Sequence, residues 1–478
     1  MDLGEIVSRD PARPSQVVWR GAASPVDADR AVTAAREAFP AWSRLTTEAR
    51  ADHLRAWSAV TQRHAERIAR LISQEMGKTL AEARQEAALL ADKVAVTLEE
   101  RVRSRIAGYD VPGGPTRTNR CTWRPYGVMA VVGPFNFPAH LPNGHWVPAL
   151  LAGNTVVFKP SERTPAVGAL MGELMAEAGI PDGVFRVVQG RGDVAASLVA
   201  HPAVDGVLFT GSWPVGRRIL EANLDRPGRM VALEMGGSNP AIVMDDADLR
   251  AAVIECVRCA FVTTGQRCTC TRRVIVHERV ADRFIAALVD AARSVTVGAG
   301  DSEPAPFMGP LVTQEAREAV LRFQAERAGA GARVLLEASS AASEGWFLSP
   351  GVMQVDAFEP ATDREVFGPL LQVAVCRDLD DAIVQANATE FGLAASVFTR
   401  STAAVDRAMH GLRAGCINVN CGTAGASGKL PFGGLGRSGN LRPAGAGMID
   451  ACAYPVASMI ESGTEVPVPA GMRVADRV

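Results

Sequence analysis

The chain has 478 residues, 47% of them hydrophobic and 21% charged, which is the composition of a folded globular protein and excludes disorder as its main state. Fifty basic and 52 acidic residues leave a net charge of −2, so the basic excess of a nucleic-acid binder is missing and we expect no nucleic-acid partner. Nine cysteines, an odd number without regular spacing, favour a reducing cytoplasmic location over a disulfide framework.

Residues 27–105 predict helices. Apolar side chains between residues 54 and 72 recur every three or four positions, which is typical of an amphipathic helix. Thr46 or Thr47 is a suitable N-cap, and Gly77 is a suitable break before a second helix over 80–103.

The next stretch, from Pro125 to Phe158, contains no Asp, Glu, Lys or Arg. Its five prolines and four glycines would interrupt any helix that crossed a lipid bilayer. We therefore expect a loop-rich part of a soluble protein here, and no membrane partner.

Short apolar runs alternate with helical stretches between residues 127 and 244. The runs cover 128–132, 155–158, 184–188, 206–209 and 230–233. This alternation predicts βαβ units and a parallel sheet covered by helices on both faces, and a second alternation follows over about 241–440. Another strand is predicted over 456–460, before a tail over 466–478. The fold class is therefore α/β.

Two motifs carry residues suited to acyl chemistry. Cys268 lies in the glycine-containing segment TTGQRCTC beside Arg267, whose charge could stabilise a thiolate nucleophile, although most cytosolic cysteines are only small buried residues. No His/Cys cluster near Cys270 completes a metal site, so we predict no metal. Glu234 ends an apolar run before two glycines, where partial burial would raise its pKa toward that of a general base, although a glutamate there can equally be a solvated edge.

Three further motifs are suited to binding. The turn FTGSWPVG, with Gly211, Ser212 and Gly216, leads from a strand into a helix and could hold a phosphate. Lys159 and Glu162 follow a strand and could bond a ribose; the carboxylate would repel a 2′-phosphate and so favour NAD over NADP. Asn136, between two prolines, is a stiff donor suited to an oxyanion hole. Each of these motifs also occurs without any ligand.

The order of these motifs along the chain resembles the aldehyde dehydrogenase superfamily. The resemblance covers about residues 20–460 and rests on PFNFP, FKPSE, FTGSWPVG, LEMGG, GQRCT, EVFGP and PFGGLGRSG. It implies a Rossmann-like NAD-binding domain over 1–107 and 127–235 and a second α/β catalytic domain over 236–445. It also implies a small β oligomerisation arm over 108–126 and 446–465, and hence a homodimer or homotetramer.

The resemblance also implies a role for each motif. Cys268 would be the nucleophile, Glu234 the base that activates water, and Asn136 part of the oxyanion hole. Among the cofactor-binding residues, Lys159 and Glu162 would hold the adenosine ribose and Ser212 the pyrophosphate of NAD. Glu365 would hold the nicotinamide ribose, and Phe367 would pack against the nicotinamide end.

Finer features resemble the subfamily that oxidises N-succinylglutamate 5-semialdehyde in arginine catabolism. They are HLPNGHWVPALLAGN at 140–154, FVTTGQRCTCTRR at 261–273 and SGNLRPAG at 438–445, while Phe135, Leu441 and Lys429 depart from its pattern. Arg442 and Arg267 are the candidates to bind the carboxylates of such an aldehyde, or else they brace the catalytic loop.

Three alternatives remain. The first is NAD-dependent oxidation of another semialdehyde or of an aliphatic aldehyde. The second is a CoA-acylating enzyme, which Glu234 disfavours because a water-activating base serves hydrolysis. The third is a non-catalytic protein on the same fold, which has no need of Cys268, Glu234 and Asn136 together.

Overall fold

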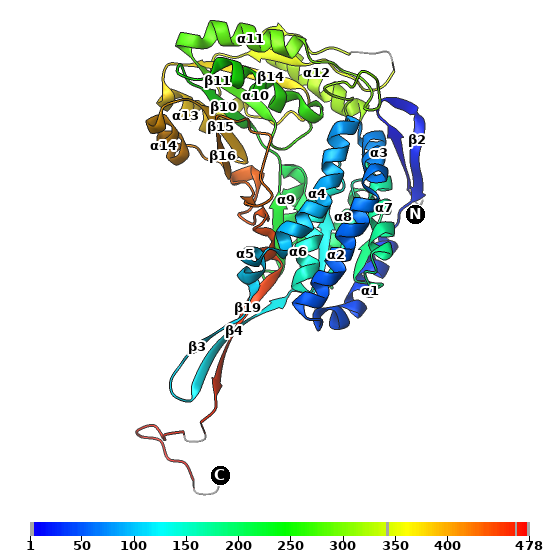
Figure 1. The fold of residues 1–478 in the computed structure, drawn as a ribbon, viewed down its shortest axis with the longest axis vertical. Helices are drawn as coiled ribbons and strands as arrows, with labels where there is room; N and C mark the ends of the chain where they lie inside the picture. Colours follow the sequence, from blue (N-terminus) through cyan, green and yellow to red (C-terminus); the bar gives the residue numbers. More distant parts are fainter. Residues whose placement is uncertain (1–3, 341–343, 464–465, 476–478) are drawn as a thin grey trace.

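The computed structural model describes residues 4–340, 344–463 and 466–475. The molecule is elongated: two α/β lobes lie one above the other, and an arm of three strands extends from the lower lobe (Figure 1). Within the described ranges, no helix combines the length and the apolar character that a membrane span requires. All nine cysteines carry free thiols.

The chain begins with an antiparallel hairpin, β1 (Glu5–Asp10) and β2 (Arg13–Ala22), for which the sequence predicted no structure. The inward residues of β1 are Ile6, Ser8 and Asp10, so two of the three buried positions are polar. The alternation of apolar residues that reveals a half-buried strand is therefore missing.

The predicted N-terminal helices are confirmed. They are α1 (Pro25–Ser43), α2 (Thr47–Arg63), α3 (Ala65–Met76), α4 (Leu80–Leu98) and α5 (Glu100–Arg103). Thr46 is the N-cap of α2, because its hydroxyl accepts a hydrogen bond from the Ala49 N–H. Gly77 ends α3 with a φ of 84°, the left-handed conformation that favours glycine.

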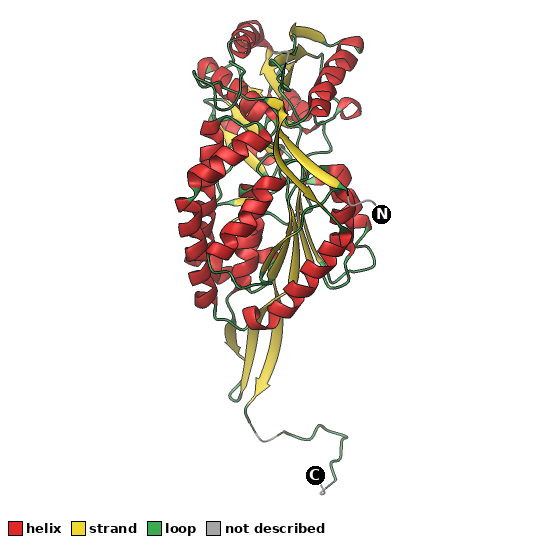
Figure 2. Ribbon diagram, turned by 90° about the vertical axis from the view of Figure 1, so that its right-hand side faces the viewer, coloured by secondary structure: helices red, strands yellow, loops and turns green. Residues whose placement is uncertain are grey.

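The lower lobe contains a parallel sheet of five strands, as predicted. The strand order is β7 (Phe185–Val187), β6 (Thr155–Lys159), β5 (Val128–Val132), β8 (Gly206–Thr210) and β9 (Met230–Glu234). The connecting helices are α6 (His140–Ala152), α7 (Pro165–Glu177), α8 (Gly192–Ala200) and α9 (Trp213–Glu221), and helices lie on both sides of the sheet (Figure 2). The strand order reverses at β5, and the crevice at the carboxyl ends of such strands is where α/β sheets bind ligands.

The upper lobe contains a sheet of seven strands, parallel except for its first edge strand. The order is β12 (Arg333–Leu336), β13 (Gly351–Gln354), β14 (Leu370–Cys376), β11 (Thr271–His277), β10 (Asn239–Val243), β15 (Ala394–Phe398) and β16 (Cys416–Val419). Its helices are α10 (Leu249–Phe261), α11 (Ala281–Arg293), α12 (Gln314–Gly329), α13 (Leu379–Asn387) and α14 (Thr402–Gly411). The α/β fold class with a second α/β lobe is confirmed.

The arm consists of β3 (Tyr109–Pro112), β4 (Arg117–Pro125) and β19 (Ala453–Glu461), all antiparallel. The predicted strand over 456–460 lies within β19. A small ribbon, β17 (Pro431–Phe432) and β18 (Ala444–Gly445), precedes it. Of the predicted arm and tail, residues 464–465 and 476–478 lie outside the described residues, and the domain boundaries themselves stay a prediction.

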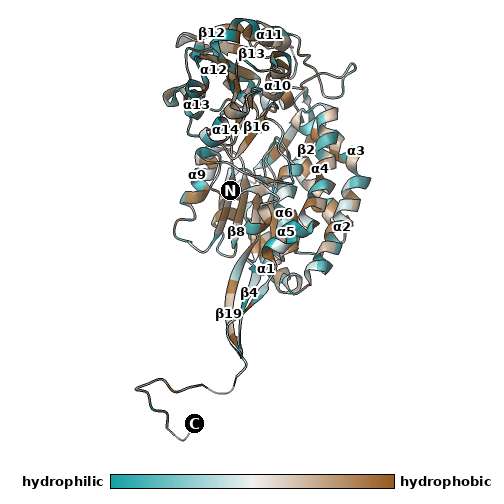
Figure 3. Ribbon diagram, turned by 60° about the vertical axis from the view of Figure 1, so that its left-hand side comes forward, coloured by the Kyte–Doolittle hydropathy of each residue, from teal (hydrophilic) through white to brown (hydrophobic). Residues whose placement is uncertain are grey.

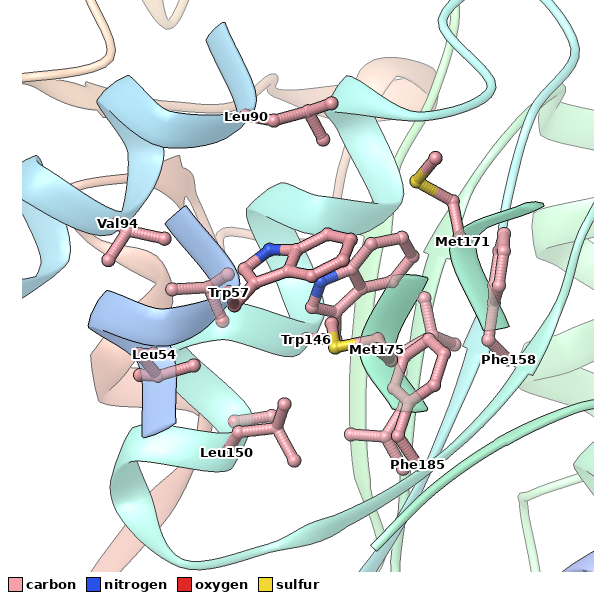
Figure 4. Close-up of a cluster of buried hydrophobic side chains, with 14 of the residues drawn as sticks. Leu54, Trp57, Leu90, Val94, Trp146, Leu150, Phe158, Met171, Met175 and Phe185 are labelled. Carbon is pink, nitrogen blue, oxygen red and sulfur yellow. The ribbon is translucent and has the colours of Figure 1, made fainter. Parts of the chain in front are cut away.

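An aromatic cluster joins α2, α6 and the lower sheet (Figure 4). The ring of Trp146 lies edge-on to those of Trp57, Phe158 and Phe185, with centroid distances of 6.4, 5.0 and 5.1 Å. The indole N–H of Trp57 also donates to the Asn143 side chain at 2.9 Å. Many of the strands are hydrophobic, while the helices carry both hydrophobic and hydrophilic residues (Figure 3). The aromatic contacts hold α6, which follows the PFNFP loop, against the sheet.

Candidate active site

A cleft of about 700 Å³ lies between the lobes, at the carboxyl ends of β5, β6 and β8. Most of the predicted site residues line it. They are Asn136, Lys159, Glu162, Gly211, Ser212, Cys268, Glu365 and Phe367. Residues more than 200 positions apart in the sequence therefore face one space.

Cys268 lies in the turn between α10 and β11. The Arg272 guanidinium donates to the carbonyl oxygens of Gly265 and Arg267 at 2.6 and 3.0 Å. The Asn239 amide donates to the Cys268 carbonyl oxygen at 2.7 Å. Gly265 has a φ of 69°, and a Cβ there would lie 2.1 Å from the Gly368 carbonyl oxygen, so this turn requires glycine. The turn thus fixes the backbone of Cys268 at the cleft.

The surroundings of Cys268 disfavour its thiolate. Burial, together with the carboxylates of Glu365 and Glu234, raises the pKa of the Cys268 thiol to about 12, while Arg272 opposes this shift. The thiol is therefore protonated at neutral pH in this state of the protein. A nucleophilic role for Cys268 requires that the thiol first lose its proton.

Glu234 is a buried carboxyl close to this thiol. It ends β9, is 4% exposed, and burial raises its pKa well above the ordinary value. Its Oε1 accepts from the Ala444 N–H at 3.1 Å, whereas within the described chain its buried Oε2 has no hydrogen-bond partner. Its neighbours Met235 and Gly236 line the cleft. A buried carboxyl with one free oxygen and a raised pKa is suited to act as a general base.

Asn136 connects its loop with the nucleophile turn. Its Nδ2 donates to the Gln266 carbonyl oxygen at 2.9 Å. The second amide hydrogen of the same nitrogen is left for a ligand. Nearby, the rings of Phe135 and Phe367 meet edge-on with a centroid distance of 5.8 Å, which links the two lobes across the cleft.

Polar groups suited to a dinucleotide lie along the lower side of the cleft. Lys159 Nζ donates to the carbonyl oxygens of Pro160 and Gly190, lies 3.9 Å from a Glu162 oxygen, and has its pKa lowered by burial to about 8. Ser212 directly precedes α9, whose amino end carries partial positive charge. These groups can hold ribose hydroxyls and phosphate.

Glu365 approaches from the upper lobe. Its Oε1 accepts from the Gly237 N–H at 3.1 Å, and burial raises its pKa. A Cβ on Gly236 would lie 1.8 Å from Glu365 Oε2, so only glycine permits this approach. The two glycines after Glu234 therefore make room for a carboxylate from the other lobe.

Four predicted site residues are not among the residues described as lining the cleft: Glu234, described above, and Gly216, Arg267 and Arg442. Gly216 packs against Met235, and its N–H bonds the Ser212 carbonyl oxygen within α9. The Arg267 guanidinium is held by Glu82 at 3.1 Å and by the Thr263 hydroxyl at 2.8 Å. Arg442 is exposed, and its positive charge opposes the burial that raises the pKa of the Tyr126 hydroxyl.

The sequence analysis missed other cleft residues. Trp213 and Arg437 line the cleft, and the guanidinium of Arg437 lies 5.8 Å from the centre of the Trp213 ring. Both occur inside quoted motifs, FTGSWPVG and PFGGLGRSG, so an aromatic or cationic residue within a motif was the available signal. Arg364 and Phe391 also line the cleft, and no motif signal marked either of them beforehand.

The chain matches the aldehyde dehydrogenase family over residues 2–455. It is 42% identical over 466 residues to the N-succinylglutamate 5-semialdehyde dehydrogenase of Hahella chejuensis (strain KCTC 2396), covering 97% of this chain and 94% of that protein. It is 43% identical over 446 residues to the protein of the same name from Pseudomonas fluorescens (strain Pf0-1), covering 93% and 91%.

Solved structures of other proteins superpose on nearly the whole chain. An NADP dependent enzyme of E. coli superposes with a TM-score of 0.91 at 34% identity, covering 96% of this chain and 95% of that one. The betaine aldehyde dehydrogenase of Staphylococcus aureus in complex with NAD+ superposes with a TM-score of 0.91 at 27% identity, covering 97% and 93%.

Proposed function

Because the chain belongs to the aldehyde dehydrogenase family, and is therefore an aldehyde-oxidising enzyme, we propose that it oxidises N-succinylglutamate 5-semialdehyde to N-succinylglutamate with NAD. One observation carries the catalytic part of the proposal: Cys268 and Asn136 line the cleft, and the buried Glu234 carboxyl lies close enough to Cys268 to raise the pKa of its thiol. The relatives that share over 40% of their residues with the chain support the substrate.

The first half of the reaction forms a thioester. Cys268 loses its proton and attacks the aldehyde carbon, and the resulting oxyanion is stabilised by the Asn136 amide and the Cys268 backbone N–H. Losing one such donor typically costs about 10²–10³ in rate. The oxyanion then collapses to the thioester as a hydride leaves the former aldehyde carbon.

Bound NAD would accept that hydride, and the cleft fits a dinucleotide. Buried Lys159 and the nearby Glu162 carboxylate are donors and acceptors for a ribose, and the amino end of α9 at Ser212 suits a pyrophosphate. Glu365 would hold the second ribose, and Phe367 lines the cleft beside it. The Glu162 carboxylate disfavours a 2′-phosphate, which supports NAD over NADP.

The second half is hydrolysis. Glu234 removes a proton from water, the water attacks the thioester carbon, and the acid leaves as Cys268 regains a proton. The raised pKa of Glu234 suits this base role, and a base here supports release to water rather than to CoA.

Arg442 binds the carboxylates of the substrate. Of the two predicted arginines, only Arg442 has an exposed side chain, because the guanidinium of Arg267 is taken by Glu82. A succinylglutamate chain carries two carboxylates, and guanidinium groups bind carboxylates in a bidentate manner.

The arm supports an oligomer. Met459 and Ile460 on β19 are 77% and 43% exposed, and such apolar residues on an edge strand favour strand pairing with another copy. We assign the enzyme to the cytoplasm because its thiols are free. We assign it as a homodimer or homotetramer because the edge strand β19 of its arm is exposed.

The substrate proposal is tested with Arg442→Met. We expect KM for N-succinylglutamate 5-semialdehyde to rise about tenfold or more, equivalent to about 1.4 kcal/mol of lost binding, while turnover of propanal changes little. Equal losses on both aldehydes would make Arg442 a structural residue and leave the charged substrate without a recognised partner.

A further inference from the structure

Helix α4 buries three charged side chains along one face. Glu82, Glu86 and Lys93 are 8%, 0% and 6% exposed. At 3.6 residues per turn, spacings of four and seven place them within about 40° of one another. Buried charges are costly unless they are paired, so their partners are informative.

Glu82 holds the nucleophile turn. Its Oε1 accepts from the Thr263 hydroxyl at 2.7 Å and from Arg267 at 3.1 Å. Thr263 has a φ of 55°, a strained conformation for a β-branched residue, which persists only where the surroundings hold it. Arg267 directly precedes Cys268, so Glu82 restrains the chain just before the sulfur.

Glu86, one turn later, holds the loop of Asn136. Its Oε1 accepts from the N–H groups of Ala139 and His140 at 3.0 and 3.1 Å, directly after the PFNFP motif. Its Oε2 accepts from buried Lys78 at 2.6 Å, and Lys78 Nζ lies 3.4 Å from the centre of the Phe137 ring. The loop is therefore fixed on both sides of Phe137.

Lys93 holds the strand that contacts the base. Its Nζ donates to the Gly445 carbonyl oxygen at 2.6 Å. The preceding residue, Ala444, donates its N–H to Glu234 Oε1 at 3.1 Å. Lys93 therefore fixes the only polar contact that the Glu234 carboxyl makes within the described chain.

We propose that α4 aligns the three reacting groups: Glu82 positions Cys268, Glu86 positions Asn136, and Lys93 positions Glu234. They are positioning residues, since none of them touches the reacting atoms. The inference rests on the proposed function, and it assigns the two glutamates to thioester formation and the lysine to hydrolysis.

Variants of the full-length protein separate these steps. With NAD and propanal, Glu82→Gln and Glu86→Gln should slow the first-turnover burst of NADH about tenfold or more, because small displacements of reacting groups are costly. Alkylation of Cys268 by iodoacetamide should not slow, since it needs no oxyanion hole. Lys93→Met should keep the burst and slow only the steady state.

The matched control is Asp92→Asn, which changes an exposed carboxylate on the same helix and should leave all rates unchanged. NAD affinity should stay within a few-fold in every variant, which reports an intact fold. Where a variant does not fold, Glu82→Asp, Glu86→Asp or Lys93→Arg, which keep the charge but displace it, should impair the same step.

Equal slowing of both steps in all three variants, or an effect of Asp92→Asn of the same size, would overturn the proposal. A wild type that oxidises no aldehyde would overturn the proposed function instead. The two failures are distinguishable because the second is seen without any variant.

Discussion

A thiol with a pKa of about 12 is a poor nucleophile, so the reactivity of Cys268 depends on its neighbours. Cys268 lines the cleft, and the charges of Glu365 and Glu234 both oppose a second negative charge there. The raised pKa of Glu234 reflects the same low-dielectric environment.

Cys268→Ala should abolish oxidation while NAD affinity stays within a few-fold, because the dinucleotide-binding groups lie elsewhere along the cleft. Cys270→Ala is the matched control, since that thiol is fully buried and donates to the Val262 carbonyl oxygen. NADH absorbance and a direct binding titration measure both effects. An active Cys268→Ala enzyme with an inactive Cys270→Ala enzyme would reverse the assignment.

Glu234→Gln should give a burst of about one NADH per active site and then stall as the thioester, once the thiolate has formed. In the wild type, turnover should rise with pH as the Glu234 carboxyl loses its proton, because burial has raised its pKa well above the ordinary value. Stopped-flow absorbance across pH checks both. Steady turnover of the variant at the wild-type rate would remove Glu234 from the mechanism.

Among the elements, α7 depends on a carboxyl from α3. Glu75 accepts from the N–H groups of Ala166 and Val167 at 2.9 Å each, and from the Ser8 hydroxyl of the N-terminal hairpin. Burial raises the pKa of Glu75 to about 7. One carboxyl therefore joins three elements just after the loop that carries Glu162.

A raised pKa means that the folded protein binds this proton more tightly than the unfolded chain does. The stabilising contribution is full below the unfolded pKa of about 4.5 and is lost as pH rises through about 7. Glutamine cannot ionise, so the Tm of Glu75→Gln minus that of the wild type should increase between about pH 5 and pH 8. Thermal unfolding scans measure it.

Glu173→Gln is the control for this prediction, because Glu173 lies on α7 but is exposed, and Arg67 lowers its pKa. Its Tm difference from the wild type should not increase over the same range. A flat difference for Glu75→Gln would show that Glu75 is ionised throughout.

The sequence predicted the elements best where each is locally marked. The five strands of the lower sheet are apolar runs between turns, and Thr46 and Gly77 mark the ends of helices. The prediction from sequence failed where charged side chains are buried. Glu82, Glu86 and Lys93 look like the solvated face of a helix, because periodicity takes charged residues to face water, whereas their partners lie far away in the sequence.

At the scale of the whole molecule, the site lies between lobes, and no local pattern brings Asn136, Cys268 and Glu365 together. Their shared cleft was expected only from the ordered resemblance to a family. The same resemblance marked Gly216 and Arg267, whose polar groups are bonded within the fold, because a motif residue can serve packing as well as chemistry. A motif thus locates a segment but does not orient each side chain.

The arm gives a prediction about assembly. Met459→Glu with Ile460→Glu should shift the protein toward monomer, because charges on an edge strand oppose pairing with another copy. Val466→Glu is the matched control, since Val466 is 80% exposed but lies outside the arm. Light scattering after size exclusion measures the mass. An unchanged mass in the arm variant would remove β19 from the interface.

The most direct test of the account is kcat/KM of the wild type with NAD on a panel of aldehydes, followed by NADH absorbance. The panel contains N-succinylglutamate 5-semialdehyde, other semialdehydes and propanal. We expect N-succinylglutamate 5-semialdehyde to be preferred by about tenfold or more, since each tenfold step corresponds to about 1.4 kcal/mol of transition-state binding. A preference for neutral aliphatic aldehydes would contradict the assigned substrate, and no NADH with any aldehyde would contradict the proposed chemistry.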